Sequence, residues 1–65
     1  MVKPMKYRDA ARQLRAAGFK PHPGKGDHEK WVGPGGHHVT IPHKTELSPG
    51  VVKQVLSAIA KESAR

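Results

Sequence analysis

The chain has 65 residues, enough for one domain with a modest core but not for a deep cavity around a small substrate. It has no cysteine, which excludes disulfides, thiolate metal ligands and cysteine nucleophiles and favours a reducing, cytoplasmic setting. Twelve Lys and Arg residues against five Asp and Glu give a formal net charge of +7, which favours a polyanionic partner, nucleic acid before acidic protein or anionic lipid. No signal peptide or membrane span is expected, because the first residues are charged and lack a long apolar run.

The first predicted element is a helix over residues 6–17. Its apolar residues recur at helical spacing and form one stripe: Tyr7, Ala10, Ala11, Leu14 and Ala17. Gly18 follows the stripe and suits the left-handed position that ends many helices. Phe19, directly after it, can fold back onto the stripe.

Three short strands are predicted after this helix. Residues 19–22 could form the first, which runs into Pro21 and Pro23 and therefore fits a sheet edge or a loop. Residues 28–32 and 37–41 form the other two, because the segment between them, rich in glycine and containing proline, is a strong turn signal. The sequence therefore predicts a β-hairpin next to an edge strand, with several turn geometries open.

The register of this hairpin depends on which face buries the single tryptophan. Side chains alternate between the two faces of a strand, so a shift of one residue would exchange them. We favour the register in which Trp31 shares the core face with Val39 and Ile41. His28 and Lys30 then point to the other face, away from the core.

A second helix is predicted near the C-terminus. Residues 42–47 are expected to be a connecting loop, Ser48 is a good N-cap, and Pro49 suits the first helical position. Apolar residues at helical spacing then continue to about Lys61, and residues 62–65 are expected to fray. The order of elements predicts an α+β fold in which both helices cover one face of a three-stranded antiparallel sheet.

Five histidines are the candidate chemical groups: His22, His28, His37, His38 and His43. A metal site is not expected, because the adjacent His37 and His38 point to opposite faces of a strand and few carboxylates accompany them. His22, His37 and His38 are expected to be exposed and without a chemical role. For His28, the residues alone leave two interpretations open: a general acid–base group, or an exposed histidine without a role.

The segment around His28 fits metal-independent cleavage of RNA. RNA carries its own nucleophile, the 2′-hydroxyl, so a nuclease needs only to move protons and stabilise the crowded phosphate. Histidine exchanges protons near neutral pH, and Lys25 and Lys30 add positive charge on either side of His28. The neighbouring glycines let backbone N–H groups approach a phosphate closely. Asp27 or Glu29 could orient the imidazole.

Four segments of the chain form a recognisable series. They are Ala17-Gly18-Phe19 at the end of the first helix, Gly26-Asp27-His28 before an aromatic-bearing strand, Val39-Thr40-Ile41-Pro42-His43, and residues 46–52 at the start of the last helix. In this order and spacing, they resemble the HicA family of toxin–antitoxin ribonucleases over nearly the whole chain.

The resemblance implies a single domain over residues 1–65, with a fold like that of double-stranded RNA-binding domains. It also implies an endonuclease that cleaves messenger RNA, arrests translation, and is partnered by a HicB antitoxin that covers the active site. The essential histidine of the family corresponds to His28. The expected RNA-binding residues are Lys25, Gly26, Lys30 and Lys44, and neither a metal nor a cofactor is expected.

The chain departs from the family pattern at Asp27, where many relatives carry serine. An anion beside His28 could orient the imidazole ring or repel phosphate locally. The alternative is therefore a non-catalytic RNA-binding module of the same fold. The sequence does not assign a role to His43.

Overall fold

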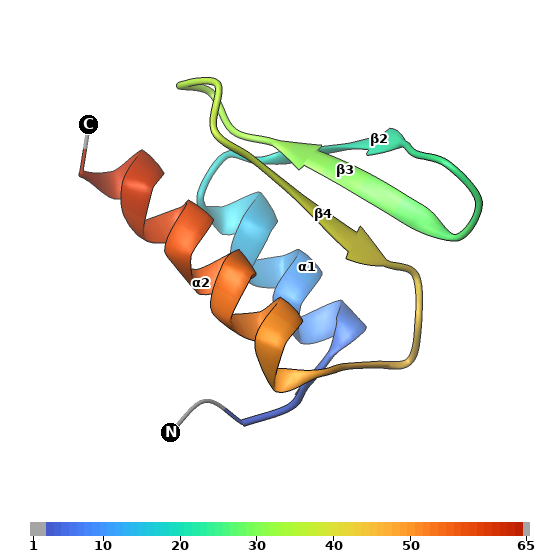
Figure 1. Cartoon of the computed structure of the whole chain (residues 1–65). Helices are drawn as coiled ribbons and strands as arrows, with labels where there is room; N and C mark the ends of the chain where they lie inside the picture. The colour runs from blue at the N-terminus through green and yellow to red at the C-terminus, as the bar shows by residue number, and fades with distance from the viewer. Residues whose placement is uncertain (1–2, 65) are drawn as a thin grey trace.

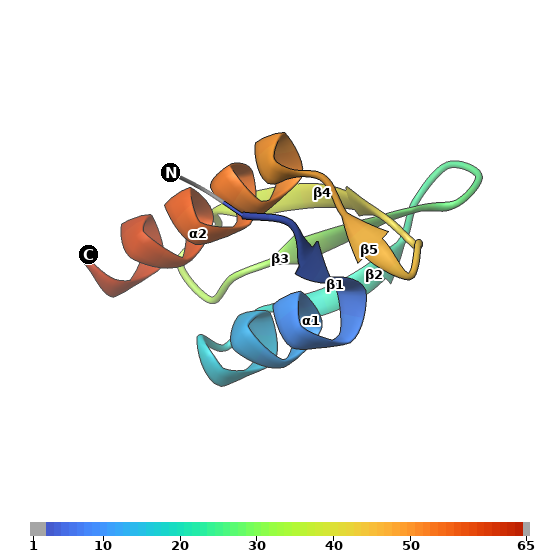
Figure 2. The same ribbon diagram turned by 90° about the horizontal axis from the view of Figure 1, so that it is seen from below.

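The computed structural model describes residues 3–64 and places two helices against one face of a three-stranded antiparallel sheet (Figures 1 and 2). The elements in chain order are β1 (Met5–Lys6), α1 (Tyr7–Ala16), β2 (Lys20–Pro23), β3 (His28–Val32), β4 (His38–Pro42), β5 (Glu46–Leu47) and α2 (Pro49–Ser63). The large sheet has the order β2-β3-β4, and β1 pairs with β5 separately. The predicted α+β architecture, like that of double-stranded RNA-binding domains, is confirmed.

Helix α1 ends as its sequence predicts. The amide of Gly18 donates to the carbonyl of Arg15 at 3.0 Å, and the amide of Phe19 donates to the carbonyl of Leu14 at 2.9 Å. Gly18 has a φ of 90°, so this pair of bonds closes the helix in the left-handed turn that glycine adopts without strain. The reversal carries the Phe19 ring into the core, where it is 2 % exposed.

The predicted hairpin register is correct. Trp31 lies opposite Val39, and Glu29 lies opposite Ile41. Trp31 and Ile41 are completely buried, and Val39 nearly so, because this face of the sheet packs on the two helices. The turn follows the glycine and proline signal: the Gly36 amide donates to the Gly33 carbonyl at 3.0 Å, and Gly36 has a φ of 93°.

Two predictions about connections and ends are wrong. Residues 42–47 are not only a loop, because Glu46–Leu47 pairs with Met5–Lys6. Neither two-residue strand is long enough to show an alternating pattern, so the sequence carries no local signal for their pairing. The fraying predicted for residues 62–65 is also wrong for the described part, since α2 continues to Ser63. Arg65 lies outside the described residues.

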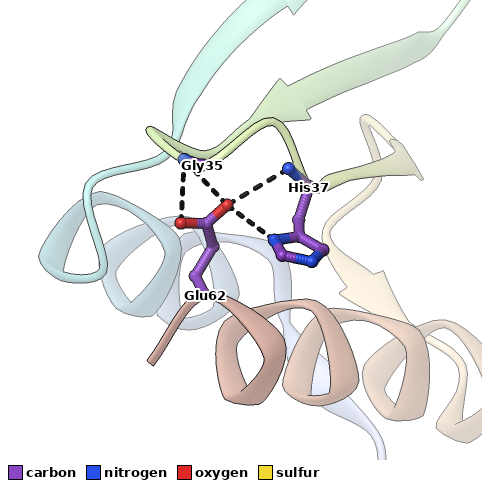
Figure 3. A network of polar contacts seen from close by, with 3 residues as sticks. All are labelled: Gly35, His37 and Glu62. Carbon is purple, nitrogen blue, oxygen red and sulfur yellow. Dashed lines mark hydrogen bonds and ion pairs between the residues drawn. The ribbon is translucent and has the colours of Figure 1, made fainter. Parts of the chain in front are cut away.

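The C-terminal turn of α2 is ordered because Glu62 binds the β3–β4 turn (Figure 3). Both carboxylate oxygens accept the Gly35 amide at 3.0 Å, and Oε2 also accepts the His37 amide at 3.1 Å. The same oxygen lies 2.9 Å from Nδ1 of His37. The contact also corrects the prediction that His37 has no role, because its ring and backbone hold the carboxylate. Glu62 is 6 % exposed, and this charged side chain is buried because the amides of the turn solvate it.

Candidate active site and nucleic-acid surface

The sheet face that turns away from the helices gathers cationic and imidazole side chains. Because Trp31, Val39 and Ile41 face the core, the alternating positions of each strand lie on the opposite side. We define these positions as the outer face: Lys20, His22, His28, Lys30, Val32, His38, Thr40 and Pro42. The outer face contains two lysines, three histidines and no carboxylate, so a polyanion meets no repelling charge from it.

His28 opens β3 directly after a tight loop. Its amide donates to the Lys25 carbonyl at 3.2 Å, and Gly26 within the loop has a φ of 64°. A Cβ on Gly24 would lie 2.4 Å from the His28 carbonyl oxygen, so the chain can pass here only with glycine. His28, Lys25 and Gly26 are all exposed, and Lys30 follows two positions along the same face as His28. The structure thus brings four of the five predicted site residues together. Lys25 and Gly26 lie in the β2–β3 loop at the end of the sheet, and His28 and Lys30 lie on the outer face.

Lys44, the fifth predicted site residue, has its backbone near the loop that precedes His28, but it lines a depression away from the outer face. The His43 amide donates to the Asp27 carbonyl at 2.7 Å, so the β4–β5 connection runs beside the β2–β3 loop (Figure 1). The His43 ring, however, packs edge-on against Tyr7 of α1, with ring centroids 4.6 Å apart and planes at 75°. Lys44 lines a depression of about 470 Å³ with Tyr7 and His43, on the helix side of the sheet end.

Glu29 does not orient His28, contrary to one of the sequence predictions. Adjacent residues of a strand point to opposite faces, and Glu29 turns toward the helices. Its carboxylate accepts a hydrogen bond from the Tyr7 hydroxyl and another, at 3.3 Å, from the Trp31 indole nitrogen. Asp27 lies in the exposed loop, and within residues 3–64 its side chain makes no hydrogen bond.

Tyr7 is a member of this region that the sequence pattern did not reveal. Its position in the apolar stripe of α1 predicted only a packing role, whereas its hydroxyl holds Glu29 and its ring supports His43. Burial, followed by the hydrogen bond to Glu29 and the negative charge of that residue, raises the pKa of Tyr7 to about 12, although Arg15 acts in the opposite direction. The phenol therefore stays neutral at physiological pH and positions its neighbours as a hydrogen-bond donor.

We expect the phenol of Tyr7 to titrate about two pH units above a free tyrosine, near pH 12 in the folded chain. A raised pKa means that the folded state prefers the protonated phenol. Its contribution to the free energy of unfolding is therefore complete below pH 10 and is lost as the pH rises through about 12. Tyr7 is the single tyrosine, so the ultraviolet absorbance of the phenolate reports it alone.

The matched variants for this titration are Glu29→Gln and Glu46→Gln. Glutamine at 29 keeps an oxygen that accepts the hydroxyl but removes the negative charge, so the midpoint should fall below that of wild type. Glu46 is exposed on β5, and its replacement should leave the midpoint unchanged. An unchanged midpoint in Glu29→Gln would mean that the carboxylate has no part in raising the Tyr7 pKa.

Within the described part of the chain, no three His, Asp or Glu side chains gather in a group that could hold a metal ion. None of the helices in residues 3–64 is long and apolar enough to cross a membrane. A search of curated proteins gives no match to the chain.

A family described as HicA toxin of bacterial toxin–antitoxin systems matches residues 7–61. The match begins at the first residue of α1, includes the whole sheet and extends through most of α2. It spans far more than half of the 65 residues, and the fold agrees with the one that the resemblance implied. The chain therefore belongs to the HicA family, the toxins of bacterial toxin–antitoxin systems, which implies an antitoxin as its partner.

Proposed function

We propose that this chain is an endoribonuclease that cleaves messenger RNA without a metal ion, with His28 as its general acid or base and a HicB-type antitoxin as its inhibitor. The observation that supports this most is the placement of an exposed histidine on a cationic sheet face that has no carboxylate. Such a face attracts the phosphates of RNA, and His28 supplies a proton-transfer group among them.

The proposed reaction uses the nucleophile that RNA itself contains. A base removes the proton of a 2′-hydroxyl, and the oxygen attacks the adjacent phosphorus. The bond from phosphorus to the 5′-oxygen breaks, and an acid protonates the departing oxygen. The products are a 2′,3′-cyclic phosphate and a free 5′-hydroxyl. His28 performs one of the two proton transfers, and the exposed position of its imidazole allows it to reach a phosphodiester laid across the outer face.

The remaining predicted residues are assigned to the phosphates. Lys25 and the backbone amide of Gly26 stand at the tip of the β2–β3 loop, and Lys30 stands on the outer face beside His28. Positive charge near the phosphate stabilises the charge that builds up in the transition state. Lys44 lies past the end of the outer face, where we assign it to a phosphate next to the one that is cleaved.

The proposal is tested with the purified chain, a single-stranded RNA and an all-deoxy strand of the same sequence, both in excess EDTA. We expect cleavage of the RNA only, with cyclic phosphate and 5′-hydroxyl ends, because the deoxy strand lacks the nucleophile. Salt-sensitive binding of an RNA that stays intact would instead identify a non-catalytic RNA-binding module. Cleavage that stops in EDTA and returns with added Mg²⁺ would contradict the metal-independent mechanism.

A further inference from the structure

The hydrogen bonds at the two ends of the β3–β4 ladder fix the direction of every backbone group on β4. Gly33 donates to the His37 carbonyl, and His43 donates to the Asp27 carbonyl, each at 2.7 Å. Paired residues in an antiparallel ladder alternate between bonded and non-bonded pairs. Val39 and Ile41 therefore bond to β3.

The N–H and C=O groups between these bonded pairs must point the other way. On β4 these are the groups of His38 and Thr40, which face out of the sheet. Within residues 3–64 their amides have no hydrogen-bond acceptor on that side. The β4 edge thus presents the N–H groups of His38 and Thr40 as two free donors. The carbonyls of the same two residues are two free acceptors, and an added strand requires this alternation of donors and acceptors.

The opposite edge of the sheet is closed by proline. Trp31 and Glu29 direct their backbone groups toward β4, so on the β2 side the bonded positions are those of Lys20 and His22. Pro21 and Pro23 then occupy the two outward positions of β2 and offer no N–H. An extended chain can therefore be added to the sheet at β4 but not at β2.

A groove of about 720 Å³ lies along the open edge, between β4 and α2. Its apolar lining comes from Val39 and Ala58, and Lys53 and Lys61 line its helix side. Its remaining lining residues include no carboxylate. On β4 the groove runs beside His38 and Thr40, and its charge is positive.

We infer that the β4 edge binds an extended acidic segment of a protein partner, which joins the sheet as a fourth strand. Its backbone pairs with His38 and Thr40, and its carboxylates meet Lys53 and Lys61 in the groove. RNA fits less well, because its phosphates only accept hydrogen bonds and its ribose hydroxyls and bases do not repeat donors and acceptors at the spacing of a β-strand. A second copy of the chain fits less well, because each copy has a net charge of +7.

This docking site does not depend on the proposed ribonuclease activity. The family membership supplies a protein partner, the antitoxin, as the natural source of the segment. Strand addition also differs from simple coverage of the outer face, since it engages the edge and the groove on the helix side. A partner held in this way is separated from β3, which carries His28, by the single strand β4.

The first test uses a capped seven-residue peptide of alternating glutamate and valine, titrated into the isotope-labelled chain and followed by amide NMR. We expect saturable shifts in β4 and in the groove side of α2, and slower hydrogen exchange at His38 and Thr40 than in the free chain. A peptide with lysine in place of glutamate should not bind. Equal binding of both peptides would overturn the charge argument, and binding of neither would overturn the proposal.

Variants at the edge separate backbone pairing from side-chain contact. Thr40→Pro removes the outward N–H and should weaken peptide binding about tenfold, whereas Thr40→Val keeps the N–H and should bind as wild type does. Lys53→Glu should weaken binding several-fold, and Lys20→Glu, with the same charge change on β2, should not. The Lys53→Glu variant keeps the test decisive if Thr40→Pro disturbs the fold, because Lys53 is an exposed helical residue.

Two further outcomes would assign the edge to a different occupant. Protection of His38 and Thr40 by a single-stranded RNA instead of the acidic peptide would make the groove a nucleic-acid surface. A concentration-dependent dimer in sedimentation equilibrium that Thr40→Pro abolishes would make the edge an interface between two copies. RNA cleavage with no peptide binding would leave the proposed function intact and reject this inference alone.

Discussion

Replacing His28 with alanine is expected to slow RNA cleavage by about 100-fold to 10,000-fold, the range that a general acid or base contributes. His28 is exposed and leaves the core untouched, so the variant should fold and should bind RNA with nearly wild-type affinity. The effect should therefore appear in the single-turnover rate constant, not in the binding constant.

The matched control for this experiment is His22→Ala. His22 is an exposed histidine on the same outer face, where it lies opposite Lys30 on the neighbouring strand. Its removal changes the same atoms on the same surface but should leave the cleavage rate near that of wild type. Comparable losses in both variants would mean that the histidines act together in holding RNA, and an undiminished rate in His28→Ala would reject His28 as the catalytic group.

Replacing Glu62 with alanine is expected to lower the free energy of unfolding by about 3 kcal/mol, because the Gly35 and His37 amides lose a charged acceptor. For a domain of this size, such a loss corresponds to a fall in Tm of about 15 °C. Glu62→Gln keeps one carbonyl oxygen as an acceptor, so its loss should be smaller. The position matters because the carboxylate holds the end of α2 against the β3–β4 turn (Figure 3).

Urea and thermal unfolding followed by tryptophan fluorescence measure this effect, since Trp31 is the single tryptophan and is buried. The control is Glu46→Ala, an exposed glutamate on β5 whose loss should cost no more than about 0.5 kcal/mol. A Glu62→Ala variant as stable as this control would show that the turn and the helix end are independent.

The elements that the sequence predicts well are those with a local, repeating pattern. The facing of the hairpin follows from period-two burial, because a shift of one residue would move Trp31 off the face that it shares with Val39 and Ile41. The end of α1 follows from Gly18, whose conformation few other residues adopt. The shared face of His28 and Lys30 follows from the same alternation.

The features that the sequence does not predict depend on contacts between distant segments. Glu62 is a charged residue near a helix end, which alone suggests fraying, and its partners are amides of a turn 25 and 27 residues earlier. The displacement of Lys44 from the outer face has a similar origin, since the neighbouring His43 ring is held by Tyr7 of α1. Neither contact leaves a periodic trace in the sequence.

The two prolines of β2 also set how many molecules this sheet can join. A sheet with two open edges can add a neighbour on each side, and repeated additions produce an open-ended fibre. Pro21 and Pro23 leave only one edge that can pair, so strand addition stops after a single event. In the complex inferred above, each chain therefore takes one strand from one partner, because its three-stranded sheet has a single edge that can pair.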